Sequence, residues 1–157
     1  VVIEETPAPQ TQPTPAPQPA PQSPTITWNG PEHIVFTIGQ AYYKNNRCYL
    51  PLKVRNTNRK DEDLLVYYSS ANGTKAYDNT GEIYQDINDF NESVFSGKSS
   101  NYSVQFPVPS KVNIPCQLVI SNFSGEASEI TLLQLSVYIY STGKSYTLEI
   151  RQLPINR

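Results

Sequence analysis

The chain has 157 residues with 14 prolines, 7 glycines, 2 cysteines, 1 histidine and no methionine, and its formal net charge is −2. That length fits about one domain, and so few histidines and cysteines exclude most zinc and redox-metal frameworks. Glu4 and Glu5 account for the net charge, so the remaining chain is neutral, which argues against nucleic acid as a partner.

Residues 1–31 form a proline-rich tail. Nine of the 14 prolines lie in this tail, and residues 6–23 contain only Pro, Ala, Gln, Thr and Ser. Proline fixes φ and removes a backbone donor, so we expect extended polyproline II that spans about 55 Å. We interpret the tail as a disordered stalk or linker, with a ligand for a proline-binding groove as the less favoured alternative.

The N-terminal sequence shows no signal peptide, and the chain has no apolar run of about 18 residues. We expect a mature or trimmed form of an exported protein of the cell envelope or outer surface. A membrane contact is expected only through an anchor upstream of Val1, such as a lipidated cysteine or a spanning helix.

Residues 32–157 are predicted to form one β domain, because hydrophobic residues recur with a period of two. Strands are expected at 33–38 and 47–56, joined through a turn at Asn45 and Asn46, which tolerate positive φ. In the second strand Cys48, Leu50, Leu52 and Val54 share one face, opposite Tyr49, Pro51, Lys53 and Arg55. Pro51 indicates an edge or a bulge. The cations and acids of residues 53–63 cancel one another and are interpreted as a solvated loop.

Further strands are expected at 64–70, 74–77, 82–86, 101–107, 116–123, 130–140 and 146–151, separated by Gly, Asn and Pro turn signals. Residues 88–100 are polar and fit either a loop or one helical turn around 91–95. No segment shows a long helical period with caps. The prediction is an all-β fold, an antiparallel two-sheet Ig-like β-sandwich of about 7–9 strands, with a closed barrel as the alternative.

Several motifs follow one another in a familiar order: CYLPLKVRNTN, DNTGEIYQ, SGKSSNYSVQFPVPS and PCQLVIS. Residues 54–58 match a V-x-N-T strand end, Gly81 to Tyr84 match a G-x-x-Y turn, and Gly97, Phe106, Val108 and Pro109 match a G-x…F-x-V-P approach. Over residues 34–154 the chain resembles the small Ig-like β-sandwich domains of unknown function from bacterial lipoproteins and secreted proteins. That group is related in fold to the mycobacterial immunoprotective extracellular antigen. The resemblance implies an exported sandwich and carries over no catalytic residue.

Cys48 and Cys116 both fall at predicted strand starts, in phase with the core face. A disulfide between them would add about 3–4 kcal/mol of stability in an oxidising compartment. Two buried free thiols are the alternative.

Residues that could carry chemistry are few. His33 is the only histidine and is expected at the surface or as a cap, and no G-x-S-x-G, H-E-x-x-H or phosphate-loop motif occurs. We therefore predict no enzyme, no catalytic residue and no cofactor. Asp86, Asn88 and Asp89 lie in the densest run of oxygen ligands, so a modest calcium site is the alternative to a polar loop.

Eleven tyrosines are many for this length. Tyr49, Tyr138 and Tyr140 fall on the predicted outward faces of their strands, where they could form an interaction surface, a stacking platform for sugars, or only part of the packing. The leading hypothesis is a non-catalytic envelope or secreted binding module with an unidentified protein or glycan partner. The alternatives are a carbohydrate-binding accessory domain that uses surface tyrosines and a purely structural spacer.

Overall fold

The computed structural model describes residues 7–15, 23–68 and 73–157. Within these ranges lie twelve strands and one short helix, so the all-β prediction is confirmed. The elements are β1 (Thr25–Trp28), β2 (Ile34–Ile38), β3 (Ala41–Lys44), β4 (Arg47–Asn56), β5 (Glu62–Tyr67), β6 (Lys75–Asp78), β7 (Ile83–Tyr84), α1 (Ile87–Phe90), β8 (Val94–Phe95), β9 (Ser103–Val108), β10 (Asn113–Ile120), β11 (Glu129–Ile139) and β12 (Lys144–Asn156).

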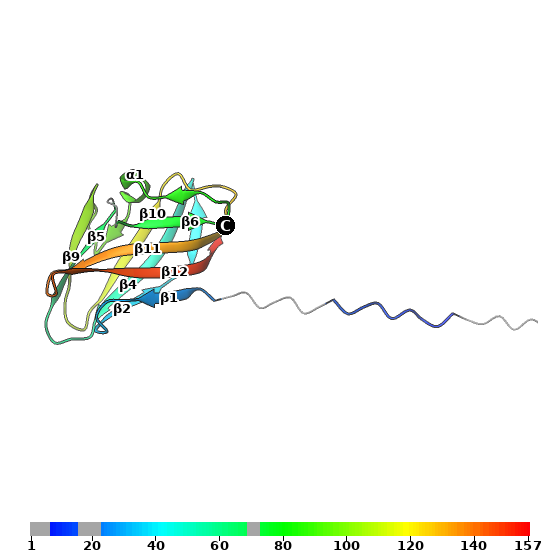
Figure 1. The fold of residues 1–157 in the computed structure, drawn as a ribbon, viewed down its shortest axis with the longest axis horizontal. Helices are drawn as coiled ribbons and strands as arrows, with labels where there is room; N and C mark the ends of the chain where they lie inside the picture. Colours follow the sequence, from blue (N-terminus) through cyan, green and yellow to red (C-terminus); the bar gives the residue numbers. More distant parts are fainter. Residues whose placement is uncertain (1–6, 16–22, 69–72) are drawn as a thin grey trace, which may run out of the picture.

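The strands form one curled sheet with two halves (Figure 1). The β11 half contains β1, β12, β11, β5, β6, β7 and β9, and the β4 half contains β2, β3, β4, β10 and β8. The end of β12 joins the halves because Ile155 pairs with Ala41 of β3 in parallel. The remaining pairs between the described strands are antiparallel. The sheet is therefore continuous and mixed, rather than two separate antiparallel sheets.

Irregularities lie shortly before the end of β12 reaches β3, where β12 still pairs with β11. The register of β11 against β6 shifts between Ile130 and Leu132, and Gln152 of β12 has a φ of 57°. Such irregularities bend strands and raise their twist. Beyond this point Leu153 and Ile155 are buried again, so the end of β12 packs on the core while it pairs with β3.

The inner faces of both halves enclose a single hydrophobic core. The period of two predicted the inward residues correctly in the longest strands. Cys48, Leu50, Leu52 and Val54 of β4 and Leu133, Leu135, Val137 and Ile139 of β11 are all buried. At roughly 25 cal/mol per Å² of buried apolar surface, this core is the main stabilising element of the fold.

The folded part begins earlier than the predicted boundary at residue 32. Thr25–Trp28 pairs with β12, and the Trp28 ring lies 4.9 Å from that of Phe36 and 5.8 Å from that of Tyr146. Residues 7–15 of the predicted stalk are exposed and form neither helix nor strand, whereas residues 1–6 and 16–22 lie outside the described ranges.

Two other segments differ from the prediction. The helical turn lies at Ile87–Phe90 instead of 91–95, because Asp89 Oδ2 accepts the backbone N–H groups of Gln85 and Asp86 and the Phe90 ring is fully buried. Residues 53–63 are not one loop, since Lys53 and Arg55 belong to β4 and Glu62 begins β5.

Pro51 lies where β4 changes partner from β2 to β3. It has no N–H to donate, while its carbonyl accepts the N–H of Gly39 at 2.8 Å. The proline therefore occupies an interruption in the hydrogen-bond ladder, as the sequence predicted.

Candidate functional site

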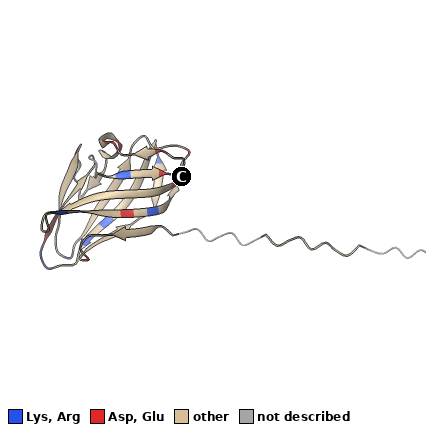
Figure 2. Ribbon diagram, in the orientation of Figure 1, with Lys and Arg blue, Asp and Glu red and all other residues tan. Residues whose placement is uncertain are grey.

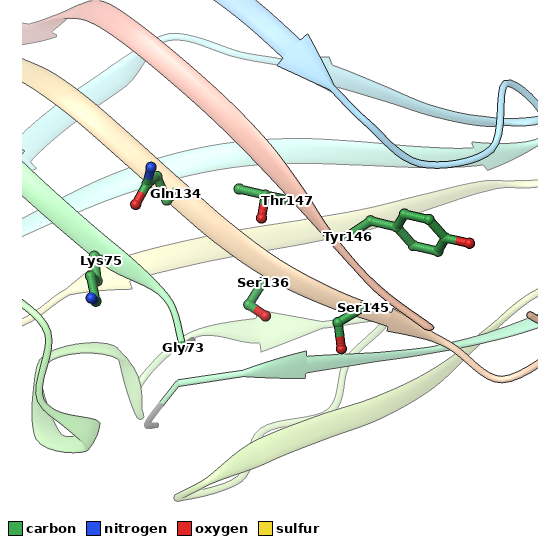
Figure 3. A pocket seen from close by; sticks show the side chains of 7 residues that line it. All are labelled: Gly73, Lys75, Gln134, Ser136, Ser145, Tyr146 and Thr147. Atoms are coloured by element: carbon green, nitrogen blue, oxygen red, sulfur yellow. The ribbon is translucent and has the colours of Figure 1, made fainter. Parts of the chain in front are cut away.

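An open depression lies on the outer face of the β11 half, where β11 changes partner. Gln134 of β11 pairs with Lys75 of β6, but Ser136 pairs with Tyr67 of β5. The depression between the diverging strands has a volume of about 400 Å³ (Figure 3). Its lining residues are Gly73, Lys75, Gln134, Ser136, Ser145, Tyr146 and Thr147.

Thr74 holds the two diverging strands in place beside the depression. Its hydroxyl donates to the carbonyl of Tyr67 at 2.6 Å, and its N–H donates to the same carbonyl at 3.1 Å. The N–H of Ser136 donates to the Thr74 hydroxyl at 3.4 Å. A buried side chain thus replaces ladder hydrogen bonds at the point where β5 and β6 separate.

Polar side chains line the depression from three strands. Figure 3 shows Gln134 and Ser136 of β11 beside Thr147 and Ser145 of β12, with Lys75 of β6 nearby. Among the described residues, none of these five side chains makes a hydrogen bond with another protein group. Three hydroxyls, one amide and one ammonium group therefore remain available to a ligand.

A tyrosine cluster, defined as Tyr67, Tyr138 and Tyr140, borders the depression. The Tyr138 ring lies 6.5 Å from that of Tyr67 and 5.1 Å from that of Tyr140, and both pairs are edge-to-face. Tyr67 lies opposite Ser136 in the ladder, and Tyr138 follows Ser136 on the same face. Aromatic surface and free polar groups are therefore adjacent.

Charge is sparse at this place. Lys75 is the charged residue that lines the depression, and among the described lining residues there is no carboxylate, histidine or cysteine. Glu149 pairs with Gln134 across the ladder, but its carboxylate is bound by Arg151. The arrangement can bind neutral polar groups, whereas it offers no positioned acid and base for proton transfer.

The structure separates the three tyrosines that the sequence grouped. Tyr138 and Tyr140 lie together on the outer face of the β11 half, beside the depression but not in its lining, whereas Tyr49 lies on the outer face of the β4 half. There its ring stacks on Tyr42 with a centroid distance of 5.0 Å and an interplanar angle of 13°. The three residues therefore do not share one surface, because their strands belong to different halves.

The predicted disulfide is also wrong. Cys48 and Cys116 are buried free thiols on neighbouring strands. Cys48 pairs with Ile120 and Cys116 pairs with Leu52, so the two cysteines lie about 13 Å apart along the strands. A disulfide needs Cα atoms within about 7 Å. Burial raises the pKa of each thiol to about 12.

The calcium candidate, Asp86, Asn88 and Asp89, lies at the start of α1. Asp89 uses one carboxylate oxygen to accept two backbone N–H groups, and Asn91 donates to Asn88 at 3.5 Å. Among the described residues, no three His, Cys, Asp or Glu side chains lie close enough together to hold a metal ion. The oxygen atoms of this run thus stabilise the local turn.

His33 is neither freely exposed nor a cap. Its Nε2 lies 3.1 Å from Oε1 of Glu62, and the two side chains are 20% and 7% exposed. Sequence reasoning missed Glu62 because the residue belongs to a run of charges. The available signal was its phase, since Glu62, Leu64 and Val66 alternate on the same buried face.

Comparison of the chain with protein-family models, with curated proteins and with solved structures finds no match. The helix of the described residues spans four residues, which is too short to cross a membrane. The function is therefore inferred from the depression and the tyrosine cluster.

Proposed function

We propose that this protein is a non-catalytic binding module that recognises a neutral carbohydrate chain through the depression and the tyrosine cluster. The observation that carries this proposal is the convergence of five free polar side chains beside three tyrosine rings. Sugars present hydroxyls that pair with such groups and C–H faces that pack on aromatic rings.

The composition of the depression supports binding without turnover. Glycoside hydrolysis commonly uses two carboxyl groups about 5–9.5 Å apart around the scissile bond. The described lining residues include no carboxyl group, and the nearby Glu149 is held by Arg151. The polar groups that a sugar would meet in the depression are therefore hydroxyl, amide and ammonium groups.

We further propose that the domain is an exported Ig-like sandwich variant presented from the cell envelope. The inner faces of the two halves enclose one core, as in a sandwich, although β12 links them. The exposed residues 7–15 contain four prolines and no helix or strand, which supports a spacer between the domain and an anchor.

A protein partner is the second candidate, favoured by the neighbourhood of β9. Tyr102 is 67% exposed and Tyr140 is 45% exposed, and the Tyr140 hydroxyl donates to Gln105 of β9. Within the described residues β9 pairs only with β5, so its other edge is free for another chain. A spacer without any ligand would use neither surface.

The proposal is tested by titrating neutral oligosaccharides, among them glucan, mannan and chitin fragments, into the full chain by calorimetry. Gln134→Ala and Tyr138→Ala should each weaken binding about tenfold, the effect of about 1.4 kcal/mol. Gln40→Ala, at an exposed position between β2 and β3, is the matched control and should leave affinity unchanged. Absence of binding across the panel, or equal loss in the Gln40 variant, would overturn the proposal. If the unmodified chain captures an envelope protein and Tyr102→Ala abolishes this capture, the second candidate, a protein partner, is favoured.

A further inference from the structure

The outer face of the β4 half carries a separate set of charges. Its strands contain four cations, Lys44, Arg47, Lys53 and Arg55, and no acidic residue. All four belong to the outward phase of β3 and β4, opposite the buried residues. Figure 2 shows where the basic residues, in blue, and the acidic residues, in red, lie along the ribbon. Although residues 32–157 carry no net charge, one face of the domain is therefore positive.

Three of these cations are free of acidic partners within the described part of the chain. Arg47 forms a salt bridge with Glu92, which hydrogen bonds place beside Ser121. The Arg55 guanidinium donates a hydrogen bond to the side-chain oxygen of Asn113, at 3.4 Å. No described carboxylate lies within salt-bridge distance of Lys44, Lys53 or Arg55. Their positive field is therefore screened mainly by solvent ions.

The outward side chains of β4 form a linear track. In chain order they are Arg47, Tyr49, Pro51, Lys53 and Arg55. Successive members lie about 7 Å apart, so the track is about 27 Å long. Its centre is aromatic and apolar, since Tyr49 stacks on Tyr42, whose hydroxyl accepts a hydrogen bond from Gln117 at 3.1 Å.

Two shallow hollows open on the same face, on either side of Pro115. One has a volume of about 290 Å³ and is lined by Thr37, Ile38, Gly39, Pro51, Leu52, Lys53, Pro115 and Cys116. The other, also about 290 Å³, is lined by Val94, Gly97, Pro115, Cys116 and Gln117. Gly39 shapes the first hollow, because an added Cβ would meet Pro51 at 3.2 Å. Ring-shaped groups could pack in these hollows beside the cations.

We propose that this face is a second binding site, whose ligand is an acidic polysaccharide that lies along β4. The carboxylates of uronic-acid residues would pair with Lys53 and Arg55, and the sugar rings would pack against Pro51, Pro115 and the Tyr42–Tyr49 pair. A linear polymer fits because the aromatic and apolar centre of the track continues directly into Lys53 and Arg55 along one strand, whereas a compact anion would use only one end of the track. This site is independent of the depression on the β11 half.

The test uses the full chain and defined polygalacturonate oligomers, with a neutral pullulan oligomer of equal length as reference. The double variant Lys53→Gln/Arg55→Gln should raise the Kd for polygalacturonate at least tenfold. The matched control Lys144→Gln/Arg151→Gln removes the same charge from the β11 half and should change the Kd less than twofold. Raising the salt from 50 to 300 mM should also weaken binding to the unmodified chain several-fold.

Thermal melting shows whether the double variant is folded. If the melting temperature of the double variant falls, the Kd of the single variant Lys53→Glu for polygalacturonate is measured instead. Three results would overturn the proposal: no binding to polygalacturonate, equal weakening by both double variants, or inorganic polyphosphate, single-stranded DNA or anionic phosphatidylglycerol vesicles binding as tightly. Because neutral oligosaccharides and polygalacturonate report on opposite faces, either site can fail without the other.

Discussion

The two outer faces of this sheet differ in how they can recognise a ligand. The face of the β11 half carries hydroxyl and amide groups beside tyrosines, and its strands contain acids as well as cations. The strands of the β4 half carry cations without acids. In the strands of both halves, outward residues alternate with residues of the shared core. The same period of two therefore produces both outer faces. A net charge near zero therefore says little about either face, because it sums over surfaces that point in different directions.

Two side-chain contacts between the halves lie away from the end of β12. Trp28 of β1 packs against Phe36 of the β4 half and Tyr146 of the β11 half. His33, which precedes β2, binds Glu62 at the start of β5. Together with the shared core, these contacts fix how the halves are placed relative to each other.

The largest expected effect comes from removing β1. A chain that begins at Glu32 lacks Trp28 and the pairing with β12, so we expect its free energy of unfolding to fall by about 3 kcal/mol. A chain that begins at Ser23 keeps β1 and should match the full chain. Urea denaturation followed by fluorescence measures both. Equal stability of the two shortened chains would show that β1 does not join the halves.

Asp78→Asn tests the end of the β11 half and should cost about 2 kcal/mol near neutral pH. Asp78 is buried and accepts hydrogen bonds from the Thr80 hydroxyl at 2.7 Å, the Tyr84 hydroxyl at 2.8 Å and the N–H groups of Thr80 and Glu82. Burial by itself would raise the pKa of Asp78, but these hydrogen bonds outweigh it and hold the pKa below its ordinary value.

The sign of the pH dependence follows from that lowered pKa. The carboxylate contributes stability above the pKa of the unfolded chain, and this contribution is lost as the pH falls through the lower folded pKa. The difference between the unmodified chain and Asp78→Asn should therefore shrink on acidification from pH 7 towards pH 3. Glu126→Gln, at an exposed position, serves as the control. A difference that stays constant with pH would contradict the assignment.

His33→Ala should lower stability by about 1.5 kcal/mol, because Glu62 would stay buried with no partner for either oxygen. The sequence alone predicted only a surface or capping histidine at this position. Adding Glu62→Gln to the variant should recover part of the loss, since a neutral amide costs less to bury than a carboxylate. Equal loss in the single and double variants would mean that His33 acts through packing only.

The smallest expected effect concerns the inner face of the β4 half. The buried thiols of Cys48 and Cys116, whose pKa burial raises to about 12, should not react with a thiol reagent in the folded protein near neutral pH. After denaturation without reductant, both should react. A reductant should leave the melting temperature unchanged, and a denatured chain with no reactive thiol would contradict the strand register.

The sequence predicted the faces of β4 and β11 because alternation along one strand is a local property. It missed β1, a short segment in a proline-rich context whose Thr25, Ile26 and Thr27 are exposed, so its pairing depends on β12. The depression could not be predicted either, because it arises where β11 exchanges β6 for β5, and no local pattern encodes which strands become neighbours. The prediction of the disulfide was wrong for the same reason. The phase of a cysteine in its strand indicates the face on which it lies, but not its register against another strand.

The pairing of β12 has a consequence for the order of folding. β12 follows all the other described strands in the chain, yet it contacts β1, more than a hundred residues earlier, as well as β3 and β11. Contacts between such distant residues raise the contact order, and proteins rich in them fold slowly. During synthesis, the edges of β1, β11 and β3 that pair with β12 therefore remain unpaired until β12 has left the ribosome. The sheet is complete only when β12 pairs, and until then the nascent chain can form incorrect strand pairs.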